Sequence, residues 1–183
     1  MRAFFLFIFI FSLFFFSCQK KEKKQTTFFE LNHFLQNQIK QLKKNHAFII
    51  KKIIVNNQEK TDTIKNPNWE KELQGIKSID IATSIAKDYQ IDTLSMDSII
   101  FRSNKNQSKG IEYVKVIDTK SKRKIEGKII DVNPMYKYRK EIIFSTQKIK
   151  EKEFLNEYTI VLSQEVRFVG DIYIKQYNQI IYK

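Results

Sequence analysis

The sequence predicts an α+β domain in which two helices of the N-terminal half pack on one face of a curved antiparallel β-sheet. Two segments of the first half carry apolar residues at helical spacing, and the chain beyond Tyr89 consists of β-rich runs separated by polar turns. Strands and helices do not alternate as they do in a parallel βαβ fold. No internal repeat and no Pro/Gly-rich linker divides residues 28–183, so we expect one domain there.

The chain begins with an apolar run from Ala3 to Phe16 that follows Arg2 and is broken only by Ser12. As a helix this run would cover about 21 Å, less than the roughly 30 Å hydrocarbon core of a bilayer. A membrane-spanning helix is therefore not expected. The charged start, the short apolar run and the small residue Ser17 are typical of a secretory signal peptide, which we assign to residues 1–17.

Cys18 is the only cysteine and stands where the cleaved chain would begin. Because a single cysteine cannot form an intramolecular disulfide, its thiol in an exported chain is available for another covalent modification. The stretch FFSC at residues 15–18 resembles the lipobox of bacterial lipoproteins in the loose, Phe-rich form of the Bacteroidota type, with phenylalanines replacing an aliphatic and a small residue. The resemblance implies that Cys18 is acylated and anchors the protein without a span. The alternative is a lone cysteine behind a conventional signal.

The charge balance is strongly basic, with 33 Lys+Arg against 20 Asp+Glu. The signal peptide holds only Arg2, so the mature chain keeps 32 minus 20, a net charge of +12. Nucleic acid is not expected as a partner, because an exported and anchored protein rarely meets it. We expect a membrane partner through the acyl chains, and an envelope protein or an anionic polymer as further partners. The resemblance implies the cell envelope, with the outer membrane favoured and the face left open.

Residues 18–27 are expected to form a basic tether between the lipid and the domain. Its lysines, Lys20, Lys21, Lys23 and Lys24, could each gain about 1 kcal/mol beside an anionic membrane surface. A solvated tether in a lysine-rich chain explains them more simply.

The first predicted helix covers residues 28–44. Thr27 and Glu30 have the spacing of a capping box, and the apolar positions that follow recur every three or four residues, at Phe28, Leu31, Leu35, Ile39 and Leu42. The run at residues 46–55 then predicts a strand, which turns at Asn56-Asn57 and returns at residues 59–65 as a hairpin.

The second predicted helix runs from Pro67 to at least Ser78. Asn66 is expected as its N-cap with Pro67 at the first helical position, and Trp69 is expected to anchor it on the sheet.

Seven strands are predicted after this helix, at residues 89–93, 97–102, 111–118, 124–132, 140–147, 158–163 and 166–175. The last shows the clearest alternation, with Val166, Phe168, Ile172 and Ile174 on one face, and with Gly170 as a bulge or bend.

Motifs for catalysis are absent from the sequence. The two histidines, His33 and His46, are not in a metal-binding motif, and no GxSxG or SxxK motif occurs. Four scattered glycines form no phosphate-binding loop. We therefore predict no catalytic residue, no metal site and no cofactor.

One segment is a candidate binding surface. Residues 133–140 read NPMYKYRK, where Tyr136 and Tyr138 lie among Arg139, Lys140 and Lys137. Tyrosine rings can stack on sugars or planar ligands while neighbouring cations hold an anion. The alternative is an Asn-Pro turn leading into a strand whose tyrosines pack on the sheet.

Two functions remain open from the sequence. The first is a membrane-anchored envelope lipoprotein that is not an enzyme and serves as a binding, structural or accessory module for a lipid, a glycan or a partner protein. The second is an envelope hydrolase with an unrecognised active site. The scarcity of His, Cys and Gly favours the first.

Overall fold

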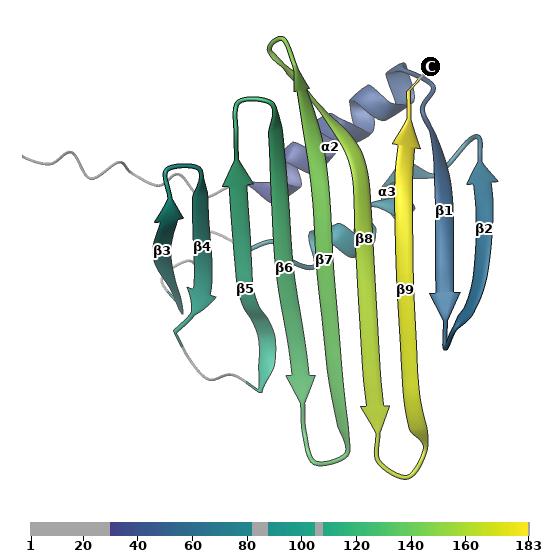
Figure 1. Cartoon of the computed structure of the whole chain (residues 1–183), viewed down its shortest axis with the longest axis vertical. Coiled ribbons are helices and arrows are strands. Elements are labelled where there is room, and N and C mark those ends of the chain that lie inside the picture. Colours follow the sequence, from purple (N-terminus) through teal and green to yellow (C-terminus); the bar gives the residue numbers. More distant parts are fainter. Residues whose placement is uncertain (1–29, 82–87, 105–107, 183) are drawn as a thin grey trace, which may run out of the picture.

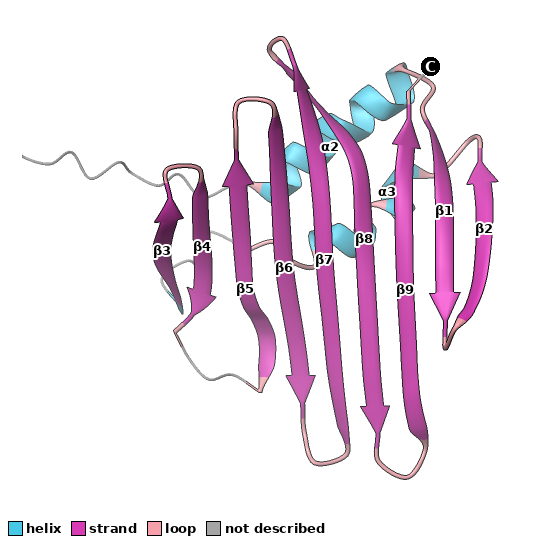
Figure 2. Cartoon of the chain, in the orientation of Figure 1, coloured by secondary structure: helices cyan, strands magenta, loops and turns pink. Residues whose placement is uncertain are grey.

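The computed structural model describes residues 30–81, 88–104 and 108–182. Within these residues, nine strands form one open antiparallel sheet in the order β2-β1-β9-β8-β7-β6-β5-β4-β3, accompanied by three short helices (Figure 1). The predicted α+β class with an antiparallel sheet is confirmed at this level, and the sheet dominates the molecule (Figure 2). No described helix combines the length and the apolar character that a bilayer crossing requires.

The helices and strands have the following bounds: α2 Leu31–Lys44, β1 Phe48–Val55, β2 Gln58–Ile64, α3 Trp69–Glu72, α4 Gln74–Lys77, β3 Tyr89–Ser95, β4 Ser98–Ser103, β5 Lys109–Asp118, β6 Lys122–Val132, β7 Tyr136–Ile149, β8 Lys152–Val166 and β9 Gly170–Ile181.

The first helix and the first hairpin lie close to the positions that the sequence predicts. α2 buries the described part of the predicted apolar stripe, to which Phe34 also belongs, whereas Phe28 lies outside the described residues. The N-cap of α2 is Glu30, whose side chain makes no capping hydrogen bond, and Thr27, the other residue of the predicted capping box, lies outside the described residues. Asn56 and Asn57 have φ angles of 44° and 73°. Two left-handed residues form the type I′ turn that suits a tight hairpin, and asparagine tolerates that conformation.

The second predicted helix is divided into two. α3 and α4 are separate four-residue helices, and the N-cap is Asn68 rather than Asn66. The Asn68 side chain accepts a 3.1 Å hydrogen bond from the backbone N–H of Lys71, which lies within the first turn as a capping donor does. Trp69 is buried in the core, with 2% of its surface exposed.

The chain between β8 and β9 corrects the last predicted strand. Residues 166–175 are not continuous: β8 ends at Val166, and the chain turns before β9 begins at Gly170. The N–H of Val169 donates to the carbonyl of Val166 at 3.1 Å, and Phe168 has a φ of 69°. Gly170 is therefore the first residue of the returning strand and not a bulge inside a longer one. The other six predicted strands lie within or overlap β3 to β8.

The hydrophobic core contains residues of the helices and of the sheet. The rings of Phe34 in α2 and Phe144 in β7 stack with their centroids 6.0 Å apart. The core also includes Trp69, Ile142 and Tyr158. Figure 1 shows the helices behind the upper half of the sheet, whereas the lower ends of β6 to β9 extend beyond every described helix. That lower region has the candidate surfaces described next.

Candidate functional site

The four predicted binding residues lie on β7 but do not share a face. Side chains alternate along a strand, and Ile142 and Phe144 are buried in the core. Tyr136, Tyr138 and Lys140 continue the face of these two residues, which is the helix side of the sheet. Arg139 points to the opposite side, where its Nη1 lies 3.1 Å from Oε1 of Glu165. The structure therefore separates Arg139 from the other three residues.

Lys140 lies where α4 meets the sheet. Its Nζ donates hydrogen bonds of 3.0 Å to the carbonyl of Gly75 and to Oγ of Ser78. Gly75 approaches β8 closely, because a Cβ added to it would lie 2.7 Å from Cδ1 of Ile160. Burial lowers the pKa of the Lys140 ammonium below its ordinary value. Both acceptors are neutral, so these two bonds leave the positive charge available to an anion.

Level with Lys140 and below it, the helix side of the sheet carries apolar side chains together with the polar Gln164 and Asp131. In the strand register, Lys140 is opposite Leu162, Leu162 is opposite Ile174, and Ile174 is opposite Val55. The next row on the same face contains Tyr138, Gln164 and Ile172. We call Val55, Tyr138, Leu162, Ile172 and Ile174 the lower shelf.

The lower shelf is partly open to solvent. Val55 is 40% exposed and Ile172 is 44% exposed, although both lie on the face that forms the core higher up the sheet. No described helix covers this part of the face (Figure 1). An apolar surface at the margin of a core, with a half-buried cation at its upper end, can hold an amphipathic molecule.

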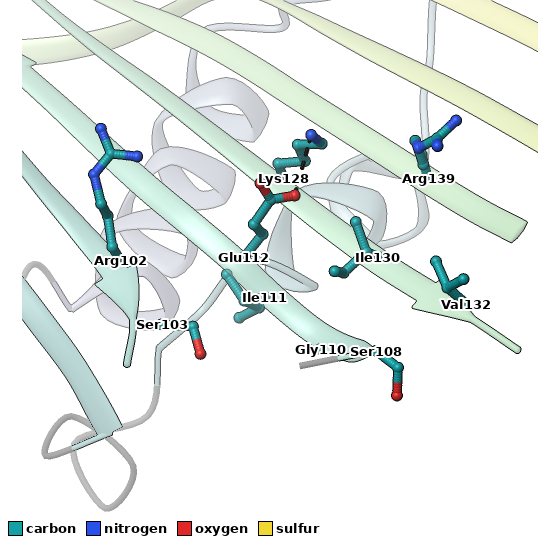
Figure 3. Close-up of a pocket in the computed structure, with 10 residues that line it drawn as sticks. All are labelled: Arg102, Ser103, Ser108, Gly110, Ile111, Glu112, Lys128, Ile130, Val132 and Arg139. Carbon is teal, nitrogen blue, oxygen red and sulfur yellow. Dashed lines mark ion pairs between the residues drawn. The ribbon is translucent and has the colours of Figure 1, made fainter. Parts of the chain in front are cut away.

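The opposite face carries a hollow of about 580 Å³ (Figure 3). Arg102 and Arg139 stand at its two ends in the view, with Lys128 and Glu112 between them. Ile130 and Val132 contribute apolar surface. Each of the three cations already has an acidic neighbour: Lys128 pairs with Glu112 at 3.1 Å, Arg139 with Glu165, and Arg102 with Asp92 at 3.7 Å.

This hollow can bind an anion only in competition with the existing pairs. Two of them are largely exposed, and exposed pairs contribute about 0–1 kcal/mol each. Replacing the acidic partner of such a pair with a ligand anion therefore costs little free energy. The sequence pattern indicates Arg139 but not Arg102 or Lys128, because only strand pairing brings these residues, which are distant in the sequence, close together.

A second hollow of about 700 Å³ lies near the start of α2 and includes His33 in its lining. Asp118 and Arg123 at its edge belong to an ion-pair network. Nη2 of Arg123 lies 2.9 Å from Asp118, and Nη1 lies 2.9 Å from Glu153. Burial opposes ionisation of Asp118, but hydrogen bonds from Arg123 and Lys148 hold its pKa below the ordinary value. These charges satisfy one another, so the network is best explained as structural.

Among residues 30–81, 88–104 and 108–182, no three or more His, Cys, Asp or Glu side chains are grouped as a metal site would require. The predicted acylation site, Cys18, lies outside the described residues. Comparison with models of known protein families, with curated proteins and with solved structures finds no match. The proposals below therefore rest on the sequence and on the geometry of the sheet.

Proposed function

We propose that this chain is a membrane-anchored envelope lipoprotein whose domain binds a lipid or a similar amphipathic molecule without catalysis. In this proposal the helices pack on one face of a curved sheet and leave the lower part of the same face for the ligand. The observation that carries the proposal is the lower shelf, an apolar surface that ends at the ammonium of Lys140.

The shelf and the cation suit the two parts of such a ligand. Apolar surface removed from water contributes about 25 cal/mol per Å², so an acyl chain lying along Leu162, Ile172 and Ile174 would be held by contact area. An anionic headgroup would then meet Lys140, whose hydrogen-bond acceptors carry no charge. A half-buried ammonium on an apolar face gains more from an anion than a fully solvated one does.

The anchor is the second part of the proposal. Acylation of Cys18 would hold the domain at the membrane, most suitably the outer membrane, where lipids are the abundant amphipathic molecules. An envelope hydrolase remains the alternative predicted from the sequence, and no arrangement among the described residues favours it.

Ligand binding is tested by two double variants on opposite faces of one strand. Tyr136→Ala with Tyr138→Ala alters the helix side, whereas Lys137→Ala with Arg139→Ala alters the open side. The mature protein and both variants would be purified from membranes and examined by native mass spectrometry for bound lipid. We expect bound lipid in the parent protein and in the open-side variant, and its loss from the tyrosine variant.

Three results would contradict the proposal. A parent protein without bound lipid would remove the basis for the shelf as a site. Loss of a bound anionic glycan in the open-side variant alone would transfer the function to the hollow of Figure 3. Equal binding by all three proteins would exclude both surfaces. Circular dichroism of each variant verifies that the domain is folded.

The anchor is tested separately. We expect the N-terminal peptide of the mature protein to begin at Cys18 and to carry the mass of its acyl chains. Cys18→Ser should release the protein from the membrane fraction. An unmodified Cys18 in membrane-bound protein would overturn the lipoprotein assignment.

A further inference from the structure

Two neighbouring hairpin turns present large apolar side chains to solvent. Met135, between β6 and β7, is 59% exposed, and Phe168 and Val169, between β8 and β9, are 89% and 82% exposed. The two turns are joined by a 2.9 Å hydrogen bond from the N–H of Arg167 to the carbonyl of Met135. They lie side by side at the lower end of the sheet in Figure 1. We call Met135, Phe168 and Val169 the apolar tips.

Other hairpin turns of the described sheet are mostly polar, although the β3–β4 turn also exposes an apolar side chain, that of Met96. The β1–β2 turn consists of Asn56 and Asn57, and the β7–β8 turn, at the opposite end, consists of Lys150 and Glu151. Polar residues and glycine are the usual occupants of hairpin turns because they accept the required backbone angles. Phe168 instead holds a bulky ring at a φ of 69°, a left-handed conformation that disfavours it. Local folding preference therefore does not account for an aromatic residue at this position.

The side chains around the tips have the character of a membrane-interface segment. The guanidinium of Arg167 lies 5.0 Å from the centroid of the Phe168 ring, which places a cation beside an apolar ring. At an interface, such a ring can enter the boundary between headgroups and acyl chains while the guanidinium stays among the phosphates. Lys137, which is 54% exposed at its side chain, adds a second cation near the turn.

We propose that the apolar tips insert into the surface of the membrane that carries the lipid anchor. This inference rests on the proposed function, because it takes Cys18 as the point of attachment. It also connects the tips to the ligand site: Val166 and Gly170 pair next to the turn, and Ile172 of the lower shelf follows two residues later. A lipid could then leave the bilayer directly onto the shelf.

The tether is long enough for this orientation. Phe34 of α2 stacks on Phe144 of β7, and the strand from Phe144 down to Tyr136 covers about 26 Å at about 3.3 Å per residue. The chain from Cys18 to Phe28, where the predicted helix begins, can extend to about 35 Å. The anchor and the tips can therefore reach the same membrane surface.

Insertion can be measured with a single added indole. Phe168→Trp in the full mature chain would be reconstituted in vesicles whose lipids carry bromine at defined depths along the acyl chain. Bromine quenches indole fluorescence only at short range, and the native Trp69 is 2% exposed, so it provides a constant background. Met96→Trp is the matched control, because Met96 is fully exposed on the β3–β4 turn and lies away from the tips.

We expect Phe168→Trp to be quenched most strongly by bromine near the headgroups, by about twofold or more relative to Met96→Trp. As a second variant, Phe168→Ser with Val169→Ser should reduce vesicle binding of the non-acylated chain from Gln19 onward by about tenfold, because two apolar side chains lose their burial.

The outcomes separate this inference from the proposed function. Quenching of the tip indole supports insertion, whereas equal quenching of both positions or none at the tip overturns it. If Cys18 proves unmodified, the lipoprotein assignment fails, while vesicle binding by the chain from Gln19 onward still decides whether the tips contact lipid. Contact of the tips with a protein partner, detected as crosslinking without quenching, also overturns the inference.

Discussion

The backbone N–H of Leu155 in β8 donates a 2.7 Å hydrogen bond to Oε1 of Gln38 in α2. Nε2 of the same side chain donates to the carbonyl of Glu153 at 2.8 Å. β9 pairs with β8 only from Glu157 onward, so β9 supplies no partner for these backbone groups. Gln38, which is 2% exposed, takes the place of the missing strand neighbour and connects the helix to the sheet.

Gln38→Leu should therefore lower the free energy of unfolding by about 2–4 kcal/mol, because it leaves the buried N–H of Leu155 and the part-buried carbonyl of Glu153 without this partner, and an unsatisfied buried group costs about 1–3 kcal/mol. Urea unfolding of the purified domain measures this change. Gln36→Leu, on the exposed side of the same helix, is the control and should change stability by no more than about 0.5 kcal/mol. Equal unfolding midpoints for the two variants would contradict the assigned role.

A close approach between Gly127 and Ile79 leads to a second prediction. A Cβ at Gly127 in β6 would lie 2.6 Å from Cγ2 of Ile79, which is 1% exposed. Gly127→Ala should cost about 1–3 kcal/mol through overpacking. Combining it with Ile79→Ala should cost less than the sum of the two single changes, because the smaller side chain removes most of the clash. A double-mutant cycle by urea unfolding measures the coupling, and strict additivity would rule out the clash.

The parts of the fold that the sequence predicts correctly are those decided by local chemistry. The turn at Asn56-Asn57 was predicted because asparagine tolerates left-handed angles, and helix α2 because its apolar residues recur every three or four positions. The turn at Arg167 to Val169 is not predicted, because its local sequence does not indicate a turn. It lacks the usual turn residues, and Val166, Phe168, Ile172 and Ile174 alternate as if in one strand.

The candidate surfaces were less predictable, because they depend on strand pairing between distant segments. The stretch NPMYKYRK pointed to Tyr136, Tyr138, Arg139 and Lys140 together, but strand geometry places Arg139 on the other face. The lower shelf depends on the pairing of β7, β8 and β9, and Val55 joins it only because β1 pairs with β9, which no local pattern indicates. Gln38 also carried no sequence signal, since one polar residue within an apolar helix stripe is common and its two backbone partners are more than a hundred residues away.

Lys140 provides a prediction about pH. Burial lowers the pKa of its ammonium in the folded state below 10.5. Between the lowered pKa and 10.5, the unfolded chain binds more protons than the folded one, so this group makes stability rise with pH in that window. Below the lowered pKa, Lys140 is charged in the folded and the unfolded state, and the full free-energy cost of burying its ammonium is present. We expect Lys140→Met to be at least as stable as the parent protein at pH 7, because Oγ of Ser78 still donates to the Gly75 carbonyl at 2.8 Å.

The measurement is urea unfolding of the parent protein and of Lys140→Met from pH 7 to pH 10. The stability difference between them should shrink as the pH rises, since the parent protein loses its buried charge. Lys137→Met, on the opposite and more exposed face of the same strand, is the control for removing a lysine from β7. A parent protein whose stability relative to Lys140→Met falls toward pH 10 would show that the ammonium is stabilising.

Phe168 is expected to reduce the stability of the domain while serving the membrane contact. Its φ of 69° is disfavoured for a residue with a bulky side chain, whereas asparagine accepts that angle more readily. Phe168→Asn and Phe168→Ala both lose the stacking with Arg167, so their difference reports the backbone alone. We expect the asparagine variant to be more stable by about 0.5–1 kcal/mol in thermal unfolding.

Val169→Asn and Val169→Ala should not differ in this way, because Val169 is not among the described residues with a positive φ. A common stability for both pairs would mean that the turn relaxes around Phe168, and strain would then be no argument for a role of that side chain at the membrane.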